Sequence, residues 1–353
     1  MERLAVVILN WNGEGFLRRF LPGVVECSTG AWAPEGCEVS VAVADNGSTD
    51  GSVDWLTETY VSPGDSRVVV LTLGQNYGFT GGYNRALEAP ELAGYDYYLL
   101  LNSDVEVTAG WLGPLVEAMR SDGSIGAAMP KMRGYERREY FEYAGAAGGF
   151  IDILGYPFCR GRIFGTVERD EGQYDTSREI FWASGAAMLV RASVWRRLGG
   201  LDEAFFAHME EIDLCWRMWR HGYRVVVAPR AAVYHVGGGA LPASSPRKTY
   251  LNFRNNLAML YKNLSRGRFA GVYGVRLGID LLQAFGYFLM GRFAFGAAIL
   301  RGHRDFWLRM RRKLDRQAGQ AEYGFRLPPK RVFYRGSIAA RYLCGRRQFG
   351  EMM

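Results

Sequence analysis

Three carboxylates crowd into four consecutive residues of the sequence, at Glu210, Glu211 and Asp213. Residues 210–221 are typical of a helix, because Gly222 follows them as a C-terminal signal. On such a helix Glu210 and Asp213 share a face, while Glu211 points about 100° away. A carboxylate can take the proton of an attacking hydroxyl group, so this cluster is a candidate general base. Acidic residues at a helix N-terminus are also stabilised by the helix dipole, without any catalytic role.

Polar residues follow four apolar runs in the first part of the chain. The runs 4–9, 39–44, 68–73 and 97–101 predict strands that alternate with helix-like stretches, the pattern of a parallel α/β sheet. Ligands of open α/β sheets bind beyond the carboxyl ends of the strands. We therefore predict a site there for a ligand that carries phosphate groups. The polar residues at these ends are Asn10 and Asn12, Asp45, the loop 76–82, and the triplet 102–104.

The loop 76–82 is rich in glycine, at Gly78, Gly81 and Gly82. Glycine lets the backbone approach a ligand closely because no Cβ intervenes. A simple turn would use the same residues. The loop is neither G-x-G-x-x-G nor a Walker loop, so a dinucleotide or ATP site gains no support.

Seven motifs occur in an order that resembles that of a known family. Together they are similar to the family 2 glycosyltransferases with the GT-A fold, in the bacterial subgroup often labelled rhamnosyltransferase-like. The resemblance covers about residues 4–262. The motifs are residues 6–12 (VVILNWN), 45–50 (DNGSTD), 76–82 (NYGFTGG), 100–104 (LLNSD), 184–186 (SGA), 209–217 (MEEIDLCWR) and 234–239 (YHVGGG).

The resemblance implies an inverting transfer of a sugar from a nucleotide-diphosphate donor, UDP- or dTDP-linked. The acceptor would be a glycan or lipid-linked saccharide in cell-surface polysaccharide synthesis. Asp45 would accept a hydrogen bond from uracil or thymine, and Asn10 and Asn12 would line the same pocket. Turn formation and helix capping are alternative roles for these residues. The predicted nucleotide-sugar-binding residues are Asn10, Asn12, Asp45, Asn76, Gly78, Gly81, Gly82, Asn84, Asn102 and Ser103.

The triplet Asn102-Ser103-Asp104 stands where the family carries its D-x-D metal motif, with asparagine in place of the first aspartate. Oxygen ligands at this motif hold Mg²⁺ or Mn²⁺, which neutralises the departing diphosphate. The resemblance makes Asp104 a metal ligand, with Glu106 as a candidate helper, and His235 the residue that completes the shell. Outside this family, Asp104 would be a turn or N-cap residue and His235 a core histidine.

Residues 209–217 match the motif that supplies the base in inverting members of the family. Glu211 replaces the usual aspartate and is the predicted base. Glu210 and Asp213 would position the acceptor or the metal ligands. On the acceptor side an aromatic ring can stack on a sugar face, while most neighbouring aromatic residues fit a hydrophobic core. The candidate acceptor contacts are Trp182, Ser184 and Gly185.

Charge divides the chain into two parts. The formal net charge is +7, yet residues 262–353 hold 19 Lys/Arg against 5 Asp/Glu, which leaves the preceding part at −7. The basic part combines an apolar stretch at 277–289 with Arg276, Arg292 and the cluster 309–313, typical of helices that lie on an anionic membrane. We predict a GT-A domain over 1–262 and a membrane-associating helical extension over 263–353. A solvated face or nucleic acid would use the same charge, and the apolar content favours the membrane.

Cysteine usage and hydropathy bear on the compartment. The five cysteines are scattered without a C-x-x-C pair, which argues against a disulfide framework or zinc cluster and fits a reducing cytoplasm. The first apolar run ends at Asn10 and is too short for a secretory signal. Residues 281–291 give 11 uncharged positions, whereas a spanning helix needs about 20. We expect a cytoplasmic protein, peripheral on the inner face of the plasma membrane.

Other functions stay open on the sequence. A catalytically inactive, membrane-docked scaffold of a polysaccharide assembly complex is compatible with the departures at Asn102 and Glu211. A sugar-phosphate nucleotidyltransferase would need a Gly-rich, Arg/Lys-containing loop after the first strand, which residues 10–15 do not supply. A nucleic-acid-binding module is a third option. Residues 131–180 predict strands and loops over the site.

Overall fold

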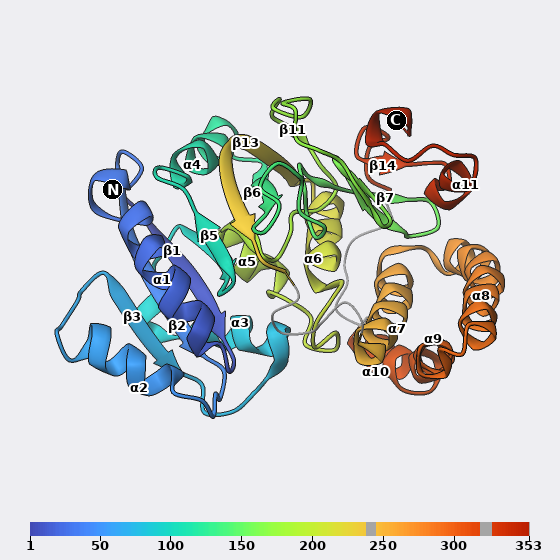
Figure 1. The fold of residues 1–353 in the computed structure, drawn as a ribbon, viewed down its shortest axis with the longest axis horizontal. Helices are drawn as coiled ribbons and strands as arrows, with labels where there is room; N and C mark the ends of the chain where they lie inside the picture. The colour runs from blue at the N-terminus through green and yellow to red at the C-terminus, as the bar shows by residue number, and fades with distance from the viewer. Residues whose placement is uncertain (238–244, 318–326, 353) are drawn as a thin grey trace.

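A computed structural model of the chain describes residues 1–237, 245–317 and 327–352. Its core is a nine-stranded sheet in the order β11-β13-β6-β12-β4-β1-β2-β3, with β5 paired to β13 (Figure 1). The strands are β1 (Glu2–Asn10), β2 (Cys37–Asp45), β3 (Val68–Thr72), β4 (Tyr97–Asn102), β5 (Val105–Val107), β6 (Ile125–Gly134), β11 (Arg178–Glu179), β12 (Ala187–Arg191) and β13 (Arg224–His235).

The four strands β3, β2, β1 and β4 run parallel, as the alternating pattern predicts. The apolar runs of β1, β4 and the second half of β2 are buried on both faces of the sheet, which is typical of parallel strands, whereas the edge strand β3 is partly buried. The register sets Asn10 opposite Asp45 and Leu9 opposite Asn102, so the polar ends of three strands meet at one edge. The helices of this half are α1 (Glu14–Ser28), α2 (Ser52–Leu56), α3 (Gly78–Glu88) and α4 (Leu112–Ser121).

The other half of the sheet is mixed. β12 runs antiparallel to both β4 and β6, and β13 runs parallel to β6. The apolar runs 223–228 and 232–235 on either side of Pro229 predict two separate strands, and this is wrong: β13 continues through Pro229. The register of β13 shifts between Ala228 and Ala232, where a residue without an N–H removes no ladder hydrogen bond. The helices here are α5 (Ala192–Leu198) and α6 (Glu210–Arg220), the latter followed by Gly222 as predicted.

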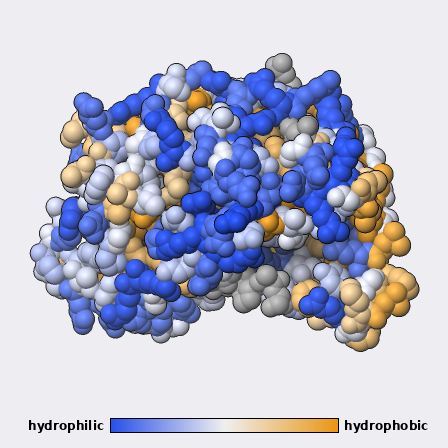
Figure 2. All heavy atoms as spheres, turned by 45° about the horizontal axis from the view of Figure 1, so that its top comes forward, coloured by the Kyte–Doolittle hydropathy of each residue, from blue (hydrophilic) through white to orange (hydrophobic). Residues whose placement is uncertain are grey.

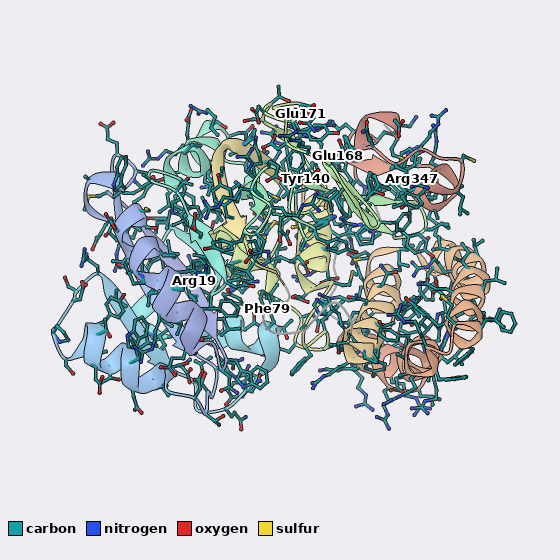
Figure 3. The ribbon with its side chains drawn as sticks, viewed as in Figure 1. Arg19, Phe79, Tyr140, Glu168, Glu171 and Arg347 are labelled. Atoms are coloured by element: carbon teal, nitrogen blue, oxygen red, sulfur yellow. The ribbon has the colours of Figure 1, made fainter. Side chains whose placement is uncertain are left out.

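A second sheet has the order β10-β9-β8-β7-β14. Most of it comes from the region 131–180, where strands and loops are predicted, but β14 comes from the C-terminal segment and pairs parallel to β7. The C-terminal segment also contacts this region through Phe349, whose N donates to Glu168 Oε1 (2.9 Å); Figure 3 shows Glu168 beside that segment. The elements are β7 (Gly149–Asp152), β8 (Pro157–Cys159), β9 (Arg162–Ile163), β10 (Thr166–Val167), β14 (Phe333–Tyr334) and α11 (Ile338–Leu343).

A layer of helices lies to one side of the sheets (Figure 1). Within the described residues, no helix is both long and apolar enough to cross a bilayer. The layer begins at Pro246, ahead of the predicted boundary at residue 262, and the segment from 327 packs against the second sheet. The 263–353 extension therefore comprises helices and a separate returning segment. The helices are α7 (Pro246–Asn263), α8 (Arg266–Leu289), α9 (Phe293–Asp305) and α10 (Arg311–Gln317).

Arg276 of α8, which the sequence places on the membrane surface, is instead buried against the body of the protein. Its Nη1 donates to Asn256 Oδ1 (2.7 Å) and Leu154 O (2.9 Å), and its Nε lies 3.3 Å from Asp280 Oδ1. Asp280 Oδ2 also lies 3.1 Å from His303 Nε2. Buried charges need such partners because desolvation is costly. This network attaches α8 to α7 and to the turn after β7.

Candidate functional site

Side chains join the ends of β1 and β2. Asn10 Nδ2 donates to Asp45 Oδ1 (3.0 Å) and Ser48 Oγ (3.1 Å), and Ser48 N donates to Asp45 Oδ2 (3.0 Å). Asn12, at φ 51°, accepts from Thr49 N (2.7 Å). Within the described residues Asn10 Oδ1 is buried and has no hydrogen-bond partner. Such an acceptor costs about 1–3 kcal/mol, so it is suited to a ligand that brings an N–H.

Asn46 connects this pocket to the glycine-rich loop. Its Nδ2 donates to Gly78 O (3.1 Å), and its Oδ1 accepts from Tyr77 N (3.0 Å). Asn76 Oδ1 accepts from Gly78 N (2.8 Å). Asn46 is not among the predicted site residues, although it stands beside Asp45 in the 45–50 motif. Asn46 and Asn76 together fix the start of α3 next to the end of β2.

The glycines of α3 are required for packing. A Cβ on Gly78, which has φ +72°, would lie 2.5 Å from the Phe206 ring, and a Cβ on Gly82 would lie 2.7 Å from Leu9. A Cβ on Gly81 would lie 2.9 Å from Arg85 Nη1. These contacts account for the three glycines without the close ligand approach that the sequence predicts.

Asn84 has a structural role in place of the predicted ligand contact. Its Nδ2 donates to Leu201 O (2.8 Å), and its Oδ1 accepts from Leu201 N (2.9 Å). Both ends of the amide are therefore used to hold α3 against the segment before α6.

The predicted metal ligands Asp104 and His235 lie together because β13 pairs with β5, which sets His235 opposite Val105. His235 Nε2 is 3.1 Å from Asp104 Oδ1 and 3.5 Å from Asn102 Nδ2, while its Nδ1 is 3.2 Å from Glu142 Oε1. Burial lowers the pKa of His235, but the charges and hydrogen bonds of Glu142 and Asp104 outweigh it and raise this pKa to about 10. Gly238 and Gly239 of the same motif lie outside the described residues.

The side chains present fit a divalent cation that the donor helps to bind. Asp104 would supply an oxygen ligand and His235 Nε2 a nitrogen ligand, with Glu142 orienting the imidazole ring through Nδ1. Glu106, the candidate helper, instead pairs with Arg138 (2.8 Å). The described ranges contain no group of three or more His, Cys, Asp or Glu that could hold a metal unaided. The diphosphate and water would complete the shell, as is common for Mg²⁺. Sequence motifs gave no signal for Glu142.

The carboxylates Glu210 and Glu211 begin α6 after a constrained loop. Phe206, His208 and Met209 all have φ near +70°, in the left-handed region. Asn255 of α7 holds this loop, since its Nδ2 lies 2.8–3.0 Å from the carbonyl oxygens of residues 205, 207 and 208. The catalytic candidates are therefore positioned by the helical layer as well as by the sheet.

Glu211 has the properties of a general base. Burial raises its pKa to about 7, and its Oε2 is buried without a hydrogen-bond partner among the described residues. Glu210 Oε2 is likewise without a partner there, and burial, with the charge of Glu211, raises its pKa well above the usual value. A base with a pKa near neutral pH is partly ionised at that pH and still binds the transferred proton strongly.

Asp213 is a structural carboxylate, unlike its two neighbours. It is fully buried and contacts Lys262 Nζ (2.8 Å), Arg217 Nε (2.9 Å) and Asn263 Nδ2 (2.8 Å). Burial raises its pKa, but the charges of Lys262 and Arg217 outweigh this and lower it below the usual value. Asp213 thus joins α6 to α7 in place of the predicted role in positioning acceptor or metal.

The three candidate acceptor contacts also fall into two groups, residues near Glu211 and a core residue. Gly185 lies between α3 and α6, since a Cβ there would be 3.2 Å from Phe79 Cζ and 3.6 Å from Glu211 Cβ. Phe79 lies near the middle of the molecule (Figure 3). Ser184 is buried next to it, and its Oγ accepts from Ala186 N (3.3 Å). Trp182 is a core residue: its Nε1 donates to Phe150 O (2.9 Å), which removes it from sugar stacking.

Known proteins resemble this chain in sequence. The model of a family described as glycosyl transferase family 2 matches residues 5–190, and that of glycosyl transferase family group 2 matches residues 168–249. The chain belongs to glycosyl transferase family 2. It is 31% identical over 244 residues to an N-acetylglucosaminyl-diphospho-decaprenol L-rhamnosyltransferase of Mycobacterium tuberculosis, covering 66% of this chain and 75% of that protein. It is 25% identical over 201 residues to rhamnosyltransferase WbbL of Escherichia coli, covering 55% and 73%.

Solved structures show that this family 2 glycosyltransferase has the predicted GT-A fold. The mannosyltransferase PcManGT of Pyrobaculum calidifontis, in complex with GDP-Man and Mn²⁺, matches with a TM-score of 0.54 at 12% identity, over 87% of each chain. S. aureus TarS 1-349 in complex with UDP-GlcNAc matches with a TM-score of 0.55 at 15% identity, over 87% of this chain and 80% of that one.

Proposed function

We propose that this glycosyltransferase moves a sugar from a UDP- or dTDP-sugar to a lipid-linked saccharide, with inversion and with Glu211 as the base. The observation that carries the proposal is the placement of Glu211: a carboxylate with a pKa near 7 lies against Gly185, beside Phe79 of α3. The printed activity of the M. tuberculosis relative, on an N-acetylglucosaminyl-diphospho-decaprenol acceptor, supports the lipid-linked class.

The donor would bind along the carboxyl edge of the parallel strands. Asn10 Oδ1 offers a buried acceptor to a base N–H, beside Asp45. Each Asp45 oxygen already accepts one hydrogen bond and keeps a second lone pair. Asn102, Ser103 and Asp104 follow on the adjacent strand, where Asp104 and His235 would hold Mg²⁺ or Mn²⁺. When bound, that cation neutralises charge on the departing diphosphate.

The transfer step needs a base and an open line of attack. The acceptor oxygen forms a bond to the anomeric carbon as the bond from that carbon to the diphosphate oxygen breaks. Glu211 Oε2 receives the hydroxyl proton, and the diphosphate leaves with the electron pair of the broken bond. Attack opposite the leaving group inverts the anomeric configuration. Burial and the charge of the neighbouring Glu211 raise the pKa of Glu210 well above its usual value, which favours its neutral form.

A lipid-linked acceptor requires a position at the membrane, and one face of α8 suits it. Leu282, Phe285 and Leu289 share this face and are 73%, 58% and 73% exposed. Figure 2 shows hydrophobic residues along the edge of the molecule where α8 lies. The exposed side chains of Arg292, Arg309 and Arg312 follow in the same layer. We infer that this surface lies on the anionic inner face of the plasma membrane and that the protein is cytoplasmic.

A donor screen with purified full-length protein tests the function. UDP-, dTDP- and GDP-sugars are supplied with Mn²⁺ or Mg²⁺ and a polyprenyl-diphosphate saccharide, and product is followed by mass spectrometry. We expect transfer from a UDP- or dTDP-sugar, lost in Asp104→Ala and in Glu211→Gln. Unchanged transfer in both variants would refute the site. No transfer and no donor binding with any sugar nucleotide would favour the inactive scaffold.

A further inference from the structure

A groove of about 630 Å³ lies between α7 and α9, outside the donor site. One wall is α9, which presents Ala294, Ala297 and Ala298 to it. The other wall is α7, with Tyr250 and Leu251. Phe206, from the constrained loop before α6, closes one end.

The sequence explains why this space is not filled. Residues 294, 297, 298 and 301 recur at helical spacing on one face of α9, and three of the four are alanine. Gly302 brings α9 close to α7, because a Cβ there would lie 3.1 Å from Phe253 Cβ and 3.3 Å from Tyr250 O. The two helices therefore cross tightly at Gly302, while short side chains toward the start of α9 leave a gap.

Arginines surround the groove. Arg247, Arg254 and Arg301 all line it, and among the residues that the structure describes no carboxylate does. Arg254 is held in place, with its Nη2 donating to Phe205 O (2.9 Å) and its Nε to Asn255 Oδ1 (2.9 Å). Arg247 and Arg301 stack over Phe206 and Tyr250, at 5.5 and 5.7 Å from the ring centroids. Neither forms an ion pair with any residue that the structure describes.

The groove adjoins both the loop before α6 and an exposed part of α9. Phe206 O accepts from Phe79 N (2.8 Å) and Thr80 N (3.2 Å), so Phe206 lines the groove and also caps α3. Glu210 and Glu211 follow in the chain four and five residues later. Ala294, which also lines the groove, follows Phe293, which is 66% exposed and packs against Phe288 of α8 with 6.2 Å between the ring centroids.

We propose that this groove binds the acceptor at its lipid diphosphate, an inference that rests on the proposed function. Guanidinium groups bind phosphate oxygens in paired hydrogen bonds, and Arg247 and Arg301 are available for this. The alanine wall of α9 accommodates the first hydrocarbon units of the lipid. A mixed lining of apolar surface with a few charged groups is suited to a ligand with both parts. The saccharide then extends past Phe206 toward Glu211.

Direct binding tests the groove independently of catalysis. In neutral detergent without donor, we expect geranylgeranyl diphosphate to bind the full-length protein more tightly than either inorganic diphosphate or geranylgeraniol. The double variant Arg247→Ala/Arg301→Ala should raise its Kd at least tenfold, and Ala297→Phe should do the same by filling the groove. Arg268→Ala/Arg335→Ala removes two exposed arginines elsewhere and should leave the Kd within twofold. Equal binding of inorganic diphosphate, or an unchanged Kd in both groove variants, would overturn the proposal.

Kinetics then separate the groove from the proposed function. With a lipid-diphosphate acceptor the double variant should raise the acceptor KM at least tenfold and leave the donor KM unchanged. With a glycoside acceptor that lacks diphosphate, wild type and variant should have the same kcat/KM. Equal losses with both acceptors would overturn the groove. A wild-type protein that transfers no sugar but still binds the lipid diphosphate would refute the proposed function alone.

Discussion

His235 Nε2 lies 3.1 Å from Asp104 Oδ1, although 131 positions of sequence separate the two residues. The pairing of β13 with β5 creates this contact, and Val236 N strengthens it by donating to Asp104 O (3.1 Å). We expect this carboxylate and this imidazole, once the imidazole has released its proton, to supply two ligands that already lie side by side to a divalent cation. Preorganisation of this kind reduces the cost of binding.

Glu142 is expected to control metal affinity without binding the metal. Glu142→Gln removes the charge next to His235 Nδ1 and leaves Asp104 and His235 in place. Second-shell partners of ligating histidines typically contribute 10–100-fold in metal affinity, and we expect a loss of about that size. Titration of Mn²⁺ by electron paramagnetic resonance, with donor nucleotide present, measures it. Glu136→Gln, an exposed control, should bind Mn²⁺ as wild type does, and equal affinity in all three proteins would contradict the role of Glu142.

The pKa of Glu211 sets the expected direction in which kcat/KM changes with pH. A base must be ionised to act, so kcat/KM should rise with pH through about 7, the raised pKa of Glu211. Glu211→Gln should lower kcat by about 10²–10⁴-fold and abolish this rise. Stopped assays between pH 5.5 and 8.5 check both points, with Glu88→Gln as an exposed control. A profile of the same shape in Glu211→Gln would assign the base elsewhere.

Replacement of Asp213 is expected to lower the free energy of unfolding. Its pKa is lowered in the fold, so its contribution is present above the unfolded value of 3.8 and is lost as the pH falls further. Asp213→Ala removes one partner each from the half-buried Lys262 and Arg217, while Lys262 keeps Asp202 and Arg217 keeps two carbonyl oxygens. We expect the unfolding free energy at pH 7 to fall by about 1–3 kcal/mol. Urea unfolding followed by tryptophan fluorescence measures this. The difference in unfolding free energy between the variant and wild type should be smaller at pH 3 than at pH 7. A difference that increases as the pH falls would contradict the ion-pair explanation.

The apolar face of α8 predicts vesicle binding. Leu282→Glu/Phe285→Glu places two charges on the exposed face and should shift the protein from the pellet to the supernatant in co-sedimentation with anionic vesicles. Glu substitutions at Val61 and Tyr143, exposed hydrophobic residues outside the helical layer, are the matched control and should still pellet. The folded fraction is checked by thermal unfolding. Oligonucleotides are the competing ligand, and retention on them in preference to vesicles would refute the membrane proposal.

The parallel half of the fold could be predicted because its information is local. Each strand from β1 to β4 is an apolar run ended by polar residues, and parallel pairing puts those ends at one edge. The contacts of Glu142 with His235 and of Asp213 with Lys262 could not be predicted, because they depend on how distant segments meet. The continuation of β13 through Pro229 could not be predicted for a related reason, since residues 229–231 stand out as unmatched only in the register against β6. Nor does the two-residue strand β14 carry any periodicity.

The helices α7 and α8 are attached to the body at two points. Asn255 of α7 holds the carbonyl oxygens of the loop before α6, and Arg276 of α8 donates to Leu154 O in the turn after β7. A segment fixed at two points resists twisting, whereas one fixed at a single point pivots freely. Adsorption of the α8 face would therefore orient the whole molecule, setting Glu211 at a constant height above the lipid plane. Acceptors would then be selected by the length of saccharide that spans this height.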